Sequence, residues 1–402
     1  MFTTKVDEFV AHNGPKITYS KTALGTEFFI RSHDLLFEQG INDIDINVAS
    51  WDEVPCFFQA GETSSIPFDI FAASFYLISR YEEYLPHVKD MHDRFPVEES
   101  IAYKNGFLEK PVIDIWALKF LEQLKNKFPN YEYSNREFKL ISTIDVDTAF
   151  AYKHKGIVRT VGGFFNDFVH FRFLNIWNRL LTLLNFKKDH FNTFQELLKI
   201  KTEYSVTTLF FFLIGDYTTF DKNISSANSK FKSLIKSVAD YAKIGLQPSY
   251  FSFKNVDKLK KEKLRLENII NTPIRFSRQH FLRLSIPETY QHLIDIDIEE
   301  DYTMGYANAV GFRASTCTPF YFYDLDFEIQ TPLKIFSFAI MDISLKENMQ
   351  LTNEESFVKI QKLKQEVKNV NGTFISLFHN QTLSENSNWK GWTTIYKNMV
   401  ID

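Results

Sequence analysis

Short apolar segments alternate with amphipathic segments over the last two thirds of the chain. The predicted strands are apolar, and each ends in polar or charged side chains; they are residues 140–144, 207–214, 244–246, 311–316 and 373–378. The predicted helices have apolar residues at helical spacing; they are residues 194–200, 229–243, 256–270 and 354–367. Strands that alternate with helices predict a parallel sheet, and polar strand ends predict an active face of the kind found in barrels. An open doubly wound sheet would bring the same side chains together.

The first part of the chain has a different pattern, with strand-like residues at 26–31 and two helical stretches. Residues 67–84 have helical apolar spacing and begin with Pro67, which suits a first helical turn, and a second helix is predicted at 113–128. The polar stretch 129–136 then interrupts the pattern. We therefore predict a mixed α/β accessory domain at 1–135 and a larger domain at 136–402, in a chain longer than the ~250–300 residues of most single cores.

Composition and charge exclude several classes of protein. The chain has a net charge of −4 and a pI of about 6.2, so it lacks the global basic field of nucleic-acid-binding proteins. No apolar run approaches the ~20 residues that a membrane-spanning helix requires. Cys56 and Cys317 are the only cysteines, which excludes a disulfide framework and a thiolate metal cluster. We expect a cytoplasmic protein, with peripheral association with a membrane left open.

Two carboxylates stand at the end of the first predicted strand of the larger domain. Asp145 and Asp147 are two residues apart, so they project to the same side if the strand continues through them. Paired acids at such a position need a metal ion, an arginine or water to compensate them. They are consistent with a loop or cap, with a metal-linked general base, or with a metal-binding pair for a nucleotide sugar. His379, after the strand 373–378, and Arg313 add an acid and a cation on the same inferred face, as acyl transfer to water requires.

Seven segments, in their order and spacing, resemble the polysaccharide deacetylase family, specifically a two-domain bacterial branch in which an extra N-terminal domain precedes the barrel. The similarity extends over roughly residues 67–396. The segments are SRYEEY (79–84), TIDVD (143–147), IGLQPSY (244–250), SRQHF (277–281), DYTMGY (301–306), GFRAST (311–316) and LFHN (377–380).

The resemblance implies an α/β fold in which a distorted (β/α) barrel follows a smaller mixed α/β domain. By position, Asp145 matches the general base and Asp147 a metal-binding aspartate. Arg313 matches the arginine that orients the base, and His379 matches the histidine that protonates the leaving amine. The implied cofactor is a divalent metal ion, zinc by family resemblance, which would polarise the acetamide carbonyl and stabilise the oxyanion.

The chain departs from the family at the metal site. The family usually supplies two histidines four residues apart, and Gln247 and Phe251 occupy the matching positions. A neutral amide is a weaker zinc ligand than imidazole, and phenylalanine cannot ligate at all. His280 is the candidate for a replacement ligand.

Three residues are candidates for substrate binding. They are Ser249, Tyr250 and Trp389, of which the last could stack on a sugar ring. The aromatic-rich segment 164–186 is longer than a simple connection, and we predict an ordinary packed helix there. A wall of a sugar-binding groove or a contact with a membrane surface is the alternative for this segment.

The first functional hypothesis is a metal-dependent hydrolase, acting on C–N bonds other than peptide bonds, that removes acetyl groups from an N-acetylated saccharide or glycan precursor. The second is a catalytically impaired relative that binds saccharide or a partner, supported by Gln247 and Phe251. A glycosyltransferase using Asp145 and Asp147 is the third, although it leaves His379 without a role.

Overall fold

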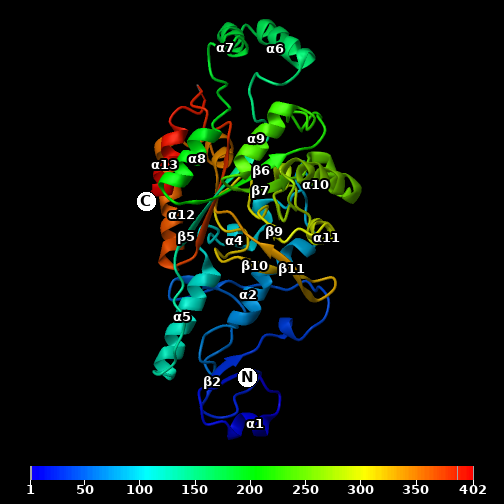
Figure 1. Ribbon diagram of the computed structural model, residues 1–402. Helices are drawn as coiled ribbons and strands as arrows, with labels where there is room; N and C mark the ends of the chain where they lie inside the picture. The colour runs from blue at the N-terminus through cyan, green and yellow to red at the C-terminus, as the bar shows by residue number, and fades with distance from the viewer. Residues whose placement is uncertain (1, 387, 402) are drawn as a thin grey trace.

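The computed structural model describes residues 2–386 and 388–401 and shows a mixed α/β protein built around a nine-stranded sheet (Figure 1). The strand order is β10-β11-β9-β8-β7-β6-β5-β13-β12. The strands are β5 (Lys139–Val146), β6 (Thr207–Leu213), β7 (Lys243–Gln247), β8 (Phe276–Ser277), β9 (Glu300–Asp301), β10 (Phe320–Asp324), β11 (Ile329–Ile335), β12 (Ile340–Met341) and β13 (Thr373–His379).

Four neighbouring strands of this sheet have buried apolar side chains. β13, β5, β6 and β7 are neighbours and run parallel, as the alternation of strands and helices predicts. The register places His379 opposite Asp145 at the carboxyl ends of β13 and β5. The two candidate residues are therefore brought together by strand pairing, although they are far apart in the sequence.

The predicted barrel is not confirmed. The strand order has β10 at one edge and β12 at the other, and the pairings among the described residues do not join these two strands. β10 also runs antiparallel to β11. Residues 311–316, which we predicted as a strand, form turns and bends instead, so that prediction is wrong.

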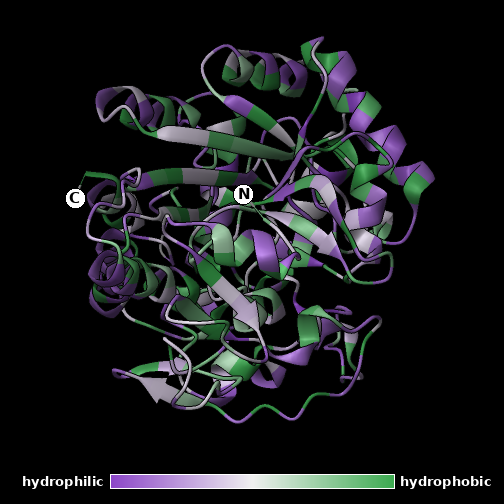
Figure 2. Ribbon diagram, turned by 90° about the horizontal axis from the view of Figure 1, so that it is seen from below, coloured by the Kyte–Doolittle hydropathy of each residue, from purple (hydrophilic) through white to green (hydrophobic). Residues whose placement is uncertain are grey.

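Helices cover the sheet, and four of those after β5 coincide with the predicted helical segments. Seen from below in Figure 2, helices lie around the periphery with strands between them. The helices of this part are α6 (Ile157–Val169), α7 (Phe173–Leu183), α8 (Phe194–Glu203), α9 (Ser229–Ala239), α10 (Val256–Ile270), α11 (Glu288–Ile294), α12 (Asn353–Asn369) and α13 (Trp392–Ile401). No helix among the described residues is long and apolar enough to cross a membrane.

The leading part of the chain forms two small sheets and several helices. These elements are α1 (Val6–Ala11), β1 (Ile17–Ser20), β2 (Phe28–Arg31), β3 (Ala49–Trp51), β4 (Val54–Cys56), α2 (Ile70–Ile78), α3 (Tyr81–Tyr84), α4 (Ile101–Lys104) and α5 (Val112–Lys127). The helix predicted at 67–84 is interrupted at Arg80, whose φ of 56° and ψ of 43° are left-handed. Such a conformation ends a helix, so α2 and α3 are separate.

The leading part and the sheet share hydrophobic packing. One hydrophobic cluster is built mainly from residues between Phe28 and Trp116, and Tyr306 and Leu325 from the later part of the chain belong to it. A larger cluster lies around the sheet and its helices. The boundary between domains at 135 and 136 stays a prediction.

The segment 164–186 is not the ordinary packed helix that its pattern predicts. It belongs to α6 and α7, two helices that project from the rest of the molecule at the top of Figure 1. Most of its large apolar side chains, including Phe165, Phe173 and Trp177, are exposed.

Candidate functional site

A cavity of about 480 Å³ lies at the carboxyl ends of the central strands. β5, β7 and β13 contribute polar side chains to it, as expected for parallel strands whose ends meet at one edge. The titratable or amide side chains that line it are Asp90, His92, Arg94, Asp145, Asp147, Gln247, Gln279, His280, Asn308, Asn348 and His379.

Asp145 is buried at the end of β5 and is held by an arginine. Arg278 Nη1 lies 2.9 Å from Asp145 Oδ1 and 2.6 Å from Thr143 Oγ1. The guanidinium also contacts the rings of Phe211 and Phe338, which restricts its orientation. Burial raises the pKa of the Asp145 carboxyl, and the charge of Arg278 opposes that rise. A carboxylate with a raised pKa that is still paired with a cation is suited to accept a proton.

Arg313 is not the arginine that contacts Asp145, which corrects our expectation from the sequence. Its guanidinium instead pairs with Glu83 on α3, with Nη2 2.6 Å and Nε 2.9 Å from the two carboxylate oxygens. Arg80 binds the same carboxylate through its Nε at 2.8 Å, and donates to the backbone carbonyl of Arg313. These side chains are all buried. Since Arg80 and Glu83 belong to the leading part of the chain and Arg313 to the later part, the network joins the two parts.

His379 is positioned by Asp342, a residue that our sequence analysis did not identify. Its Nδ1 lies 2.8 Å from Asp342 Oδ1, and its backbone N–H donates to Oδ2. Burial alone would lower the pKa of His379, but the carboxylates of Asp342, Asp147 and Asp145 outweigh it and raise the pKa to about 10. The imidazole is therefore protonated at neutral pH, as a general acid requires.

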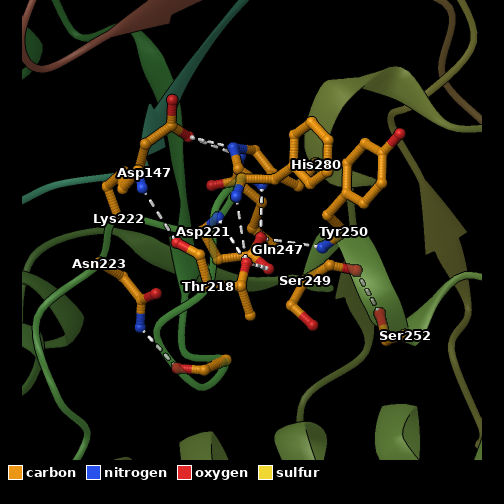
Figure 3. A network of polar contacts seen from close by, with 12 residues as sticks. Asp147, Thr218, Asp221, Lys222, Asn223, Gln247, Ser249, Tyr250, Ser252 and His280 are labelled. Atoms are coloured by element: carbon orange, nitrogen blue, oxygen red, sulfur yellow. Dashed lines mark hydrogen bonds and ion pairs between the residues drawn. The ribbon is translucent and has the colours of Figure 1, made fainter. Parts of the chain in front are cut away.

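Asp147, Gln247 and His280 point towards one another at the cavity (Figure 3). Gln247 Nε2 donates to Asp147 Oδ1 at 2.8 Å, and His280 Nε2 lies 3.6 Å from the same oxygen. The other ring nitrogen of His280 lies 2.9 Å from Asp221. Asp221 is thus a second positioning carboxylate that the sequence analysis missed.

The spacing of two of these side chains, Asp147 and His280, is compatible with two ligands of a divalent cation. Two ligands of a tetrahedral ion, each bonded at about 2.0–2.2 Å, stand about 3.4 Å apart, close to the separation of Asp147 and His280. The hydrogen bond between His280 and Asp221 is of the kind that fixes the orientation of a metal-binding imidazole. Gln247 Oε1 is buried and makes no hydrogen bond with the described residues, so it has an unused lone pair.

The donor set is weaker than that of a usual zinc enzyme. Within the described residues, no group of three or more His, Cys, Asp or Glu side chains could hold a metal ion. The Oε1 atom of Gln247 would add a ligand only after a rotation of the amide that turns this oxygen towards the cation, because Nε2 now donates to Asp147. Phe251 is an exposed side chain, so the residue at the matching position of the family's second histidine provides no ligand.

The three predicted substrate-binding residues lie outside the lining of the cavity. Ser249 is buried and its hydroxyl donates to Glu262 at 2.6 Å, and Tyr250 stacks on Phe220 with ring centroids 3.9 Å apart. Trp389 belongs to the main hydrophobic cluster and packs against Trp392. Each side chain is occupied by internal contacts, and a role of these three residues in substrate binding stays a prediction.

The leading part of the chain forms one wall of the cavity. Asp90, Met91, His92 and Arg94 line it, and Arg94 is anchored by a hydrogen bond to the carbonyl of Phe281 at 2.9 Å. No pattern in the sequence predicted this contribution. The cavity is therefore built from both parts of the chain.

Residues 1–129 match the model of a family of unknown function, DUF7033. No curated protein matches the chain.

Several solved structures are similar at low identity. A protein of Mycobacterium smegmatis assigned as a polysaccharide deacetylase is 12% identical, with a TM-score of 0.42, over 67% of this chain and 85% of that chain. The polysaccharide deacetylase Bc1974 of Bacillus cereus is 13% identical, with a TM-score of 0.31, over 66% of this chain and 87% of that chain. BA3943 of Bacillus anthracis, a CE4 family pseudoenzyme, is 12% identical, with a TM-score of 0.31, over 67% of this chain and 62% of that chain. At these TM-scores the similarities carry no inference about the site.

Proposed function

We propose that the cavity is the active site of a metal-dependent hydrolase that removes acetyl groups from an N-acetylated saccharide. The observation that carries the proposal is that a group able to accept a proton and a group able to donate one line the same cavity. Asp145 is a buried carboxylate held by Arg278, and His379 is an imidazole kept protonated by Asp342. A base and an acid next to a candidate cation site are the groups that hydrolysis of an amide requires.

The roles of the side chains follow from their protonation. Asp145 accepts a proton from the attacking water as the new C–O bond forms. His379 donates its Nε2 proton to the amide nitrogen as the C–N bond breaks, so that acetate and an amine leave. A divalent cation supplies polarisation of the carbonyl and stabilisation of the oxyanion when bound by Asp147, His280 and Gln247. The cavity volume is within the usual range for small-molecule sites, and Met91, Phe281 and Leu377 offer apolar surface to a sugar.

One observation favours a second candidate, a saccharide-binding protein that has lost catalysis. Gln247 presents its N–H group, not its carbonyl oxygen, to Asp147. In this orientation the amide occupies a lone pair of the carboxylate and provides no ligand. The two functions differ in whether the purified protein holds a metal ion.

Gln247→His is expected to raise the zinc content of the purified protein, because imidazole is a stronger zinc ligand than an amide. A gain of about ten-fold in zinc affinity is expected, by analogy with the loss that removal of a supporting group causes at metal sites. Acetate release from N-acetylated chitooligosaccharides should rise with it. Elemental analysis and an acetate assay measure the two effects.

His280→Ala is the matched test of the existing donor set. If His280 is a ligand, the wild type should hold metal and the variant should lose most of it. Gln247→Ala is the control for Gln247→His, since it removes the amide without adding a ligand. A metal-free wild type whose Gln247→His variant gains neither zinc nor activity would reject the hydrolase and favour the binding protein.

A further inference from the structure

The helical hairpin formed by α6 and α7 has a charged pair inside. Asp167 and Arg179 are buried between the two helices and form an ion pair with 2.6 Å between Nη2 and Oδ2. The guanidinium also contacts the rings of Tyr152 and Phe164. In a helix pair of a water-soluble protein the apolar side chains normally occupy this position.

The apolar side chains of the hairpin are on its outside. Val158 is 86% exposed, Phe165 69% and Trp177 58%. The other large apolar residues exposed on the hairpin and its flanks are Ile157, Val161, Phe168, Val169, Phe171, Phe173, Leu174, Leu180, Leu184 and Phe186. An exposed set of this size on one projecting element marks an interaction surface, because single exposed apolar residues are normal but a contiguous group is not.

The same segment is strongly basic in a chain whose net charge is negative. Residues 153–190 contain seven Lys or Arg and two Asp, whereas the whole chain has a net charge of −4. Both acids are committed to internal contacts: Asp167 to Arg179, and Asp189 to the backbone N–H groups of residues 151–153. The charge presented outward by Arg172 and Lys188, which are both exposed, is therefore positive.

We propose that the α6–α7 hairpin docks onto the surface of a lipid bilayer that contains anionic phospholipids. Bulky apolar side chains flanked by Lys and Arg are the composition of helices that lie in the membrane interface. The helices have 13 and 11 residues, well below the ~20 needed to span a bilayer, so they lie in its plane. A second copy of the chain is a poorer occupant, because two hairpins face to face would bring like charges together.

The proposal is independent of the hydrolase activity, since it rests on a different part of the molecule. It is tested by sedimentation of the full-length protein with phosphatidylcholine vesicles with and without phosphatidylglycerol. Binding is expected with phosphatidylglycerol and is expected to fall with salt. The fluorescence of Trp177 should shift to shorter wavelength, because the other tryptophans, Trp51, Trp116, Trp389 and Trp392, are buried.

Two variants separate the apolar and the electrostatic contributions. A triple variant with Phe165→Ser, Phe173→Ser and Trp177→Ser is expected to bind at least about ten-fold more weakly, since each side chain loses apolar burial. Its matched control changes exposed apolar residues elsewhere, Tyr241→Ser, Phe327→Ser and Val358→Ser, and is expected to bind like the wild type.

Arg172→Glu with Lys188→Glu is expected to remove the preference for phosphatidylglycerol. Circular dichroism and analytical ultracentrifugation accompany each variant to establish folding and oligomeric state. The proposal is overturned if the wild type binds neither vesicle, or if the triple variant and its control lose binding equally. It is also overturned if the only effect of the triple variant is the dissociation of a dimer.

Discussion

Asp145→Asn is expected to reduce acetate release from an N-acetylated chitooligosaccharide by about 10²–10⁴-fold, the usual contribution of general acid–base catalysis. The amide cannot accept the proton of the attacking water, although its oxygen can still accept the hydrogen bond from Arg278. The fold should therefore survive. The measurements are initial rates of the metal-supplemented protein, with circular dichroism as the check on folding.

Asp114→Asn is the matched control for this substitution. Asp114 is also a buried carboxylate with an arginine partner, Arg136, but it contacts Thr316 and Cys317 and does not line the cavity. It is expected to lower stability while leaving turnover intact. Unchanged turnover in Asp145→Asn would remove Asp145 from the role of base.

Glu83→Gln is expected to lower the free energy of unfolding by about 3–5 kcal/mol, the cost of breaking a buried ion pair by removing one partner. Glu83 accepts hydrogen bonds from both Arg313 and Arg80, and all three side chains are buried. The neutral amide leaves the buried guanidinium of Arg313 short of a counter-charge, whereas Arg80 keeps its ion pair with Glu82. Urea unfolding measures the effect.

The control for Glu83 is Glu99→Gln, which removes the partner of Lys104 at the surface. Exposed pairs of this kind contribute at most about 1 kcal/mol, so little change is expected. Equal losses in the two variants would show that the buried network is not a special source of stability.

The same carboxylate predicts a dependence of stability on pH. Burial alone would raise the pKa of Glu83, but Arg313 and Arg80 outweigh it and lower the pKa to about 2, from an ordinary value of 4.5. The folded state therefore binds the proton less readily than the unfolded state, and the ionised carboxylate stabilises the protein above the ordinary pKa. This stability is lost as the pH falls through 4.5 towards 2, and Glu83→Gln should flatten that part of the profile.

The sequence predicted best where long buried strands set the positions of side chains. β5, β6, β7 and β13 have clear apolar patterns, and pairing in register brings His379 to Asp145. β8, β9 and β12 have only two residues each, too few for a periodic pattern to be recognised. Asp342 follows β12 directly, so no strand signal could have identified it.

The arginine assignment could not be made from residue type and order alone. Arg278 and Arg313 both lie in segments that resemble the deacetylase family, and either side chain is long enough to reach a strand end. The deciding contact is with Glu83, whose position depends on the left-handed backbone of Arg80 between α2 and α3. Similarly, an aromatic or hydroxyl side chain such as Trp389 or Ser249 does not show from its type whether it faces a cavity or a core.

The buried contact of Glu83 with Arg313 has a consequence for any attempt to divide the molecule. A fragment beginning at residue 136 would expose part of a hydrophobic cluster, leave Arg313 without its carboxylate, and lose the cavity wall formed by Asp90, His92 and Arg94. A chimera with a foreign leading segment would have to restore the same counter-charge at the same depth. The polar stretch at 129–136 therefore interrupts the apolar pattern of the sequence, but it is not a site at which to truncate the chain for expression.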